Sequence, residues 1–214
     1  MGNPHTKVEI SFKTQIIEPV PIYFAYTQLM MWDILIASPY FYDLNYDPLF
    51  FYRFSINKDK TQYLDFIPIE HESNGRGSDT ERSWDRVALM YHFSQKVAAT
   101  DGPMFNASIK AWLPFGKGIN NKNILEYRGV WQLEMGLSNF MGKHFDFNDL
   151  SLRLYPGGKS YTNPTRGGQE LTYRLQAKSF KFLPLFILQL FHGYGESLQD
   201  YSRSIWAVRA GLGF

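Results

Sequence analysis

The stretch "GGQELTYRLQAK", residues 167–178, follows a pair of glycines with strict alternation between apolar and polar side chains. Neighbouring side chains on a β-strand point to opposite faces, so a period of two is typical of a strand whose faces meet different environments. The apolar positions are Leu171, Tyr173, Leu175 and Ala177, and the polar positions are Glu170, Thr172, Arg174, Gln176 and Lys178.

The same period recurs along the chain, separated by turns rich in Gly, Pro, Asn and Asp. "MFNASIKAWLP" (104–114) and "EYRGVWQLEMGLS" (126–138) are two further clear cases. A fold made only of such segments is all-β and antiparallel. We expect eleven strands, at residues 7–16, 22–35, 47–57, 62–73, 83–97, 104–114, 125–139, 145–155, 168–179, 183–194 and 204–214.

Two architectures fit this alternation. The apolar faces pack inward in a soluble β-sandwich, whereas in a transmembrane β-barrel they meet lipid and the polar faces line the lumen. The barrel is favoured because large aromatics lie near strand ends and charges of both signs lie at strand centres. The last segment, "SIWAVRAGLGF" (204–214), also closes on Phe214, which resembles the assembly signal of bacterial outer-membrane proteins.

We therefore predict a single antiparallel transmembrane β-barrel domain over residues 1–214, with about 12 strands. Bacterial single-chain barrels have even strand numbers, so eleven visible strands suggest that a first strand is missing ahead of Lys7. The opening "MGNPHTKVEIS" (1–11) lacks the apolar core of a signal peptide, so an exported protein would be represented here in processed or truncated form.

Composition limits the possible partners. The 214 residues carry a net charge of +2 and are 17% aromatic, so we expect no nucleic-acid partner. There is no cysteine, which excludes disulfides, thiolate metal sites and a cysteine nucleophile. Mean hydropathy is −0.30, and no run approaches the ~20 apolar residues of a spanning helix. This search for a long apolar run does not detect barrel strands, because their apolar and polar faces average to mild hydrophilicity.

Residues that often do chemistry gather in "HESNGRGSDTERSWDR" (71–86), between two expected strands. We assign the odd positions from Tyr63 through Asp65 and Ile67 to Ser73 to one apolar, lipid-facing side, on which Asp65 is an unexplained exception. The odd positions of the next strand, Asp85 among them, fall on the same side.

This face brings three candidate side chains together. The i, i+2 spacing of His71 and Ser73 puts them ~7 Å apart on one face. A loop centred near Ser78 would set His71 opposite Asp85, with Cβ atoms ~5 Å apart. Nucleophile, base and base-orienting acid would then converge on the barrel exterior at a strand end. The plain alternative is a polar hairpin tip without catalytic function, since H-x-S alone is a weak motif.

The wider stretch is more specific. "HESNGRGSDTERSW" followed by Asp85 and Arg86 resembles the active-site hairpin of the bacterial outer membrane phospholipase A family, where the pattern reads approximately H-Q-S-N-G-R, six residues, S-W-N-R. Three further segments resemble family blocks in the same order, and the resemblance runs from about Lys7 to Phe214. They are "AYTQ" (25–28) with Trp32, "SPYFYDLNYDP" (38–48) and "GYGESLQDY" (193–201).

The resemblance implies a catalytic set. Ser73 would be the nucleophile that attacks a phospholipid ester, and His71 would be the general base. Asp85 would stand where the family has Asn as the third member, and Asp stabilises the imidazolium better than Asn. The backbone N–H of Gly75 would be one oxyanion donor.

The resemblance also implies Ca²⁺ as cofactor and activity as a homodimer. The ion would be held by the carbonyl of Arg76, by Glu81 at the place of a family serine, and by a partner-subunit serine that aligns near Ala37 or Ser38. The carboxylate of Glu81 is a stronger ligand for a hard cation than a hydroxyl. Gln28 matches a polar residue on the family's dimer face.

We therefore expect a calcium-dependent phospholipase of the bacterial outer membrane, with membrane phospholipid as substrate and its site at the extracellular leaflet. Two other functions stay open. One is a non-catalytic barrel, a pore or structural protein, against which the joint presence of His71, Ser73, Gly75 and Arg76 argues. The other is a lipid A deacylase-type esterase, against which the segment 193–201 argues.

Overall fold

The computed structural model describes residues 6–97, 102–142, 145–177 and 184–213. Within them, no helix is long and apolar enough to cross a membrane. The strands are β1 (Thr6–Gln15), β2 (Ile22–Asp33), β3 (Tyr40–Ser55), β4 (Gln62–Ser73), β5 (Ser83–Lys96), β6 (Met104–Lys117), β7 (Trp131–Ser138), β8 (Phe145–Gly157), β9 (Asn163–Ala177), β10 (Leu185–Gly193) and β11 (Ile205–Gly213). The described residues also form one short α-helix, α1 (Leu125–Arg128), and two 3-10 helices, Ser78–Thr80 and Ile119–Asn121.

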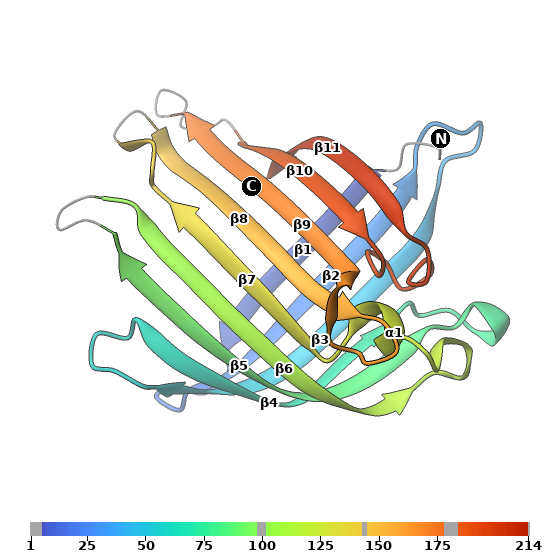
Figure 1. The fold of residues 1–214 in the computed structure, drawn as a ribbon, viewed down its shortest axis with the longest axis horizontal. Helices are drawn as coiled ribbons and strands as arrows, with labels where there is room; N and C mark the ends of the chain where they lie inside the picture. Colours follow the sequence, from blue (N-terminus) through green and yellow to red (C-terminus); the bar gives the residue numbers. More distant parts are fainter. Residues whose placement is uncertain (1–5, 98–101, 143–144, 178–183, 214) are drawn as a thin grey trace.

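The strands form one sheet in which each pairs antiparallel with the next along the chain. The sheet curves round into a barrel-shaped wall (Figure 1). Lys7 on β1 crosses the interior to Glu170 on β9, with Nζ 2.9 Å from Oε2. No ladder joins β1 to β11 in the described part of the chain. The predicted all-β antiparallel barrel is confirmed; the twelfth strand remains a prediction.

Strand boundaries differ from the prediction by more than three residues in three places. β3 begins at Tyr40 rather than 47, and β9 begins at Asn163 rather than 168. The segment expected to start a strand at 125 instead forms α1, and β7 begins only at Trp131. Parts of two expected strands, including Lys178, and the terminal Phe214 lie outside the described residues.

The two faces of the sheet have opposite chemistry. Large apolar side chains on the outer face are exposed, with Leu113 70% and Trp206 78% accessible. The inner face carries charged side chains that are almost inaccessible, such as Glu70 at 2% and Arg86 at 3%. Apolar side chains turned outward and buried charges turned inward are the arrangement expected of a barrel in a lipid bilayer.

One end of the barrel is filled by its loops. Strand directions alternate, so the loops after β2, β4, β6, β8 and β10 share this end. The loops 118–130 and 194–204 fold over the lumen, and Ile124 and Leu198 from them pack against Trp84 and Trp112 of the wall. This apolar cluster closes the end at which the 74–82 hairpin loop lies.

Candidate active site

An extra residue in β4 decides which way the hairpin's side chains point. Between Ile67 and Glu70 β4 advances three positions while β5 advances two, and the β3–β4 register shifts at the same level. Pro68 lies in this β-bulge and has no N–H to contribute to a ladder. Because side chains alternate along a strand, one extra residue exchanges the two faces beyond it.

The bulge corrects the predicted face of the first half of β4. Asp65 and Ile67 do not face lipid; they point inward and are 4% and 2% exposed. The Asp65 carboxylate accepts two hydrogen bonds from Arg53, at 2.8 and 2.7 Å, and lies 3.0 Å from His92 Nε2. Asp65, which the prediction left unexplained on the apolar face, therefore lies in the lumen, where it is bonded to Arg53 and His92.

Beyond the bulge the prediction agrees with the structure. Glu70 and Glu72 point inward and are buried, so the alternating residues His71 and Ser73 lie on the outer face. β5 has no such interruption, and its outer face carries Asp85. The bulge is thus what places the candidate catalytic side chains on the outside of the barrel.

His71 and Asp85 form a direct hydrogen bond. They are register partners, and His71 Nδ1 lies 2.7 Å from Asp85 Oδ1. When the carboxylate is ionised it can only accept, so Nδ1–H donates this bond and Nε2 of the neutral ring keeps a free lone pair. Both side chains are partly exposed, 43% for His71 and 33% for Asp85. The arrangement suits a base whose ring is held by an acid.

Ser73 lies two residues along the same face. It pairs with Ser83 on β5 and with Tyr46 on β3, and its side chain is partly buried. Its hydroxyl has no hydrogen-bond partner among the described residues. Nucleophile–base hydrogen bonds are often long in ligand-free sites and shorten when substrate binds. The structure thus brings His71 to Asp85 and leaves Ser73 within the same outward patch.

A glycine on β6 makes room for the acid. Gly116 is the register partner of Asp85, just after a second register shift. A Cβ at Gly116 would lie 3.2 Å from Asp85 Cγ and still closer to a carboxylate oxygen. Any side chain there would displace the carboxylate that holds His71.

Asn74 organises the loop after Ser73. It is 2% exposed, and its Oδ1 accepts from the backbone N–H groups of Arg76 and Arg82, at 3.3 and 2.9 Å. Its Nδ2 donates to the Thr80 carbonyl at 2.8 Å and to Gln199 Oε1 at 3.4 Å. One buried amide therefore fixes both arms of the loop and joins them to the last loop of the chain.

Gly75 adopts a backbone conformation that favours glycine. Its φ is +61°, in the left-handed region, and a Cβ would lie 2.9 Å from Tyr46 Cε2. It is exposed, and its N–H donates to no group in the described residues. A free N–H two residues after Ser73 is available to an incoming anion.

The three predicted calcium ligands differ in placement. The side chain of Arg76 donates to the Tyr42 carbonyl, which attaches the loop to β3. Glu81 Oε1 accepts from Ser83 Oγ at 3.5 Å, whereas Arg82 contacts the Glu81 carbonyl and not its carboxylate. Ser38 is exposed in the 34–39 loop, and none of the described contacts brings it to the hairpin.

Oxygen donors of the kind that Ca²⁺ prefers are present here. The Arg76 carbonyl accepts no backbone hydrogen bond from described residues, and the Glu81 carboxylate and Ser83 hydroxyl already lie together. No cluster of three or more His, Asp or Glu side chains in the described chain could hold a metal. A calcium ion would thus rest on a mixed set of carbonyl, hydroxyl and single carboxylate oxygens, which fits its chemistry.

The last loop fixes the surroundings of the hairpin. The backbone N–H groups of Leu198 and Gln199 donate to Asn45 and Asp43 on β3, at 2.9 and 2.8 Å. Tyr201 donates to Asn123 Oδ1 at 2.6 Å, and burial raises the pKa of its phenol. The segment 193–201 is therefore a structural plug of the barrel end.

Sequence reasoning missed Pro68, Asn74 and Gly116. A proline inside an otherwise regular strand pattern indicates a β-bulge, so the position of Pro68 in the sequence could have predicted this one. Asn74 and Gly116 carried no such signal, because their roles depend on which residues the β4–β5 and β5–β6 registers bring beside them.

The chain is similar to known proteins over most of its length. A family model described as phospholipase A1 matches residues 2–214. Phospholipase A1 of Proteus vulgaris is 31% identical over 196 residues, and that of Escherichia coli K12 is 30% identical over 195 residues. Both matches cover 88% of this chain and 60% of the relative, so the chain spans about three fifths of the length of these relatives.

Two solved structures of outer membrane phospholipases have a fold similar to that of this chain. The outer membrane phospholipase A of Escherichia coli superposes with a TM-score of 0.75 at 24% identity, over 96% of this chain and 76% of that one. The Salmonella typhi outer membrane phospholipase, a dimer with bound calcium, gives a TM-score of 0.74 at 24% identity, over 97% of this chain and 77% of that one. These likenesses bear on the fold.

Proposed function

The chain belongs to the phospholipase A1 family, and from this membership we propose that it hydrolyses acyl ester bonds of phospholipids in the bacterial outer membrane. The observation that carries the proposal is the 2.7 Å bond between His71 and Asp85 on the outer face, two residues from Ser73. A hydrolase of membrane lipids needs its nucleophile at the lipid–water boundary, and an outward strand end supplies that place.

The proposed reaction uses His71 twice. Ser73 Oγ attacks the carbonyl carbon of the ester while its proton moves to His71 Nε2, and Asp85 stabilises the imidazolium through Nδ1. When the tetrahedral intermediate collapses, the leaving alkoxide takes that proton and departs as a lysophospholipid. Water then attacks the acyl-serine with His71 as base, which releases the fatty acid and restores Ser73.

The negative charge that develops on the carbonyl oxygen needs donors. The N–H of Gly75 is the proposed donor of this chain, since it lies two residues after Ser73 and has no partner among the described residues. Asn74 holds that loop in shape with four hydrogen bonds. A donor fixed in advance costs no reorganisation when the charge appears.

We propose Ca²⁺ as the cofactor, bound by the Arg76 carbonyl, the Glu81 carboxylate and the Ser83 hydroxyl. A bound divalent cation beside the oxyanion would add Lewis-acid stabilisation. The Glu81–Ser83 contact supports this set, because it brings two oxygen ligands together within one chain. Ser38 would join from a second copy of the chain, as a calcium-bound dimer of a similar protein suggests.

The proposal includes a single barrel domain over residues 1–214 and a homodimer when active, with Gln28 on the contacting face. Gln28 accepts from Tyr26 Oη at 3.2 Å on the outer side of β2. The longest loops, 118–130 and 194–204, lie at the site end. Since longer loops are extracellular in such barrels, this supports an active site at the outer leaflet.

Two substrates test the proposal. The purified protein in detergent should release fatty acid from phospholipid with calcium and stop in chelator, and it should release none from lipopolysaccharide. Release from lipopolysaccharide alone would favour a lipid A deacylase. No release from either, with Ser73 unlabelled by a fluorophosphonate, would favour a non-catalytic barrel.

A further inference from the structure

Charged side chains occupy the inner face directly behind the proposed catalytic residues. On β4, Glu70 and Glu72 alternate with His71 and Ser73 and point into the lumen, 2% and 5% exposed. On β5, Arg86 follows Asp85 and is 3% exposed. The outward triad and an inward charged cluster therefore share the same backbone segments of the wall.

Arg86 joins the two glutamates. Its Nη2 lies 3.0 Å from Glu70 Oε1 and 3.1 Å from Glu72 Oε2, and its guanidinium carbon lies 3.8 Å from the centre of the Trp84 ring. Trp84 Nε1 donates to Glu72 Oε2 at 2.9 Å. We call Glu70, Glu72 and Arg86 the inner clamp.

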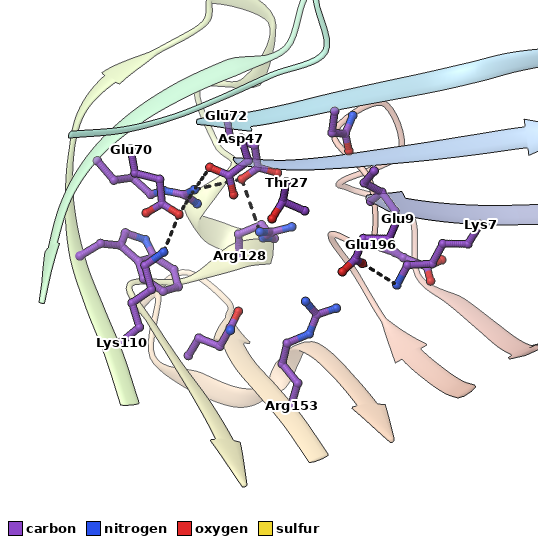
Figure 2. Close-up of a pocket in the computed structure, with 15 residues that line it drawn as sticks. Lys7, Glu9, Thr27, Asp47, Glu70, Glu72, Lys110, Arg128, Arg153 and Glu196 are labelled. Carbon is purple, nitrogen blue, oxygen red and sulfur yellow. Dashed lines mark hydrogen bonds and ion pairs between the residues drawn. The ribbon is translucent and has the colours of Figure 1, made fainter. Parts of the chain in front are cut away.

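Two further cations contact the clamp, one from strand β6 and one from helix α1. Lys110 Nζ on β6 lies 2.5 Å from Glu70 Oε1, and Arg128 Nη2 at the end of α1 lies 3.5 Å from Glu72 Oε2. Figure 2 shows Glu70 beside Lys110 and Glu72 beside Arg128, close to Asp47 of β3. A buried charge without its partner is costly, so each member has one strongly favoured position.

The clamp fixes the backbone on both sides of His71. Glu70 and Glu72 flank it along β4, and their cross-strand partners Arg86 and Trp84 flank Asp85 along β5. The His71–Asp85 bond is therefore framed by two inward contacts to the same guanidinium. A shift of either glutamate would move Ser73 and His71 relative to each other.

We propose that Glu72 and Arg86 are positioning residues for hydrolysis, which act through the barrel wall on the geometry of Ser73 and His71. The proposal rests on the proposed function of that pair. It goes beyond that function because the clamp is buried on the inner face, whereas Ser73 and His71 lie on the outer face. A displacement of about 1 Å in a reacting group can cost about a hundredfold in rate, so small shifts in the clamp reach the reaction.

Another lumen ion pair, which shares strand β4 with the clamp, supplies a control. Arg53 on β3 and Asp65 on β4 form a bidentate pair at 2.7 and 2.8 Å, with the Asp65 side chain 6% exposed. It lies below the Pro68 bulge, on the side away from the hairpin. Asp65→Asn weakens this lumen ion pair without altering the segment behind His71.

The experiment compares Glu72→Gln and Arg86→Lys with Asp65→Asn in full-length protein in detergent. Three quantities are measured: kcat and KM on phospholipid, the rate at which a fluorophosphonate labels Ser73, and the heat-resistant migration of the folded barrel. We expect the clamp variants to fold and to lose about tenfold to a hundredfold in kcat and in labelling rate, with KM changed less than about twofold. Asp65→Asn should keep both rates within about threefold, whatever its loss of heat resistance.

Clamp variants that label and turn over as fast as Asp65→Asn would overturn the positioning role. So would failure of both clamp variants to fold, because the cluster would then be a structural requirement. Failure of the proposed function is a separate outcome, since wild-type protein would then neither take the label at Ser73 nor release fatty acid.

Discussion

The Asp85→Ala substitution isolates the contribution of the third member of the proposed triad. Asp85 holds His71 through one hydrogen bond of 2.7 Å. A hydrogen bond to a charged partner contributes about 1.5–3 kcal/mol. Because His71 and Asp85 are 43% and 33% exposed, water competes and the lower part of that range, about 1.5–2 kcal/mol, applies. Since about 1.4 kcal/mol corresponds to tenfold, kcat should fall about ten- to thirtyfold.

The assay is release of fatty acid from mixed micelles at saturating calcium, with heat-resistant migration as the check on folding. Asp85→Asn should lose less than about fivefold, because its carbonyl oxygen can still accept from Nδ1–H. Asp79→Ala, which removes another acid of the same hairpin, should be as active as wild type. Full activity of Asp85→Ala, or equal losses for Asp85→Ala and Asp79→Ala, would refute the role given to the His71–Asp85 bond.

Three further predictions concern other parts of the site and the wall. Gly116→Ala should lower kcat about tenfold by displacing the Asp85 carboxylate, and it should add little to Asp85→Ala in a double-mutant cycle; additive losses would contradict the contact. Glu81→Gln should raise the calcium concentration for half-maximal activity by about tenfold, with little change at saturation, because it removes the formal charge from the ligand set. Identical calcium titrations of activity for wild type and Glu81→Gln would show that Glu81 is only a solvated loop charge. Glu81→Ser should stay active, with a calcium requirement that depends more on dimer formation. Spin labels at Leu133 and Glu134 should report lipid and lumen respectively, and equal polarity at both would contradict the barrel.

Alternation along single strands could be predicted from the sequence because it depends on local chemistry alone. The period around Leu171 and Leu133 needs only the difference between lipid and a polar lumen. The pairing of His71 with Asp85 was predictable for a similar reason, since a short hairpin loop fixes the register of its own strands.

Features that depend on neighbours distant in sequence were not predictable in the same way. In the sequence, the segment 125–130 continues the alternation of β7. In the structure its start forms α1, because Ile124 and Leu125 pack into the apolar cluster under the last loop. The inward turn of Asp65 depended on the bulge at Pro68, and a strict period of two carried past a proline gives the wrong face.

The same limit applies to the candidate site. His71, Ser73, Asp85 and Gly75 are close in sequence, and a motif could identify them. Gly116 could be identified only from the β5–β6 register, which places it opposite Asp85. A contact of this kind becomes visible only when strands are placed side by side.

The most direct test of the central claim is to identify the residue that a fluorophosphonate modifies, together with hydrolysis of phospholipid by the same preparation. Mass spectrometry of the labelled protein should place the adduct on Ser73, labelling should abolish fatty-acid release, and Ser73→Ala should neither label nor hydrolyse while it keeps its heat-resistant barrel. Hydrolysis by Ser73→Ala at the wild-type rate, or an adduct on another residue with activity lost, would contradict the assignment of Ser73 as nucleophile.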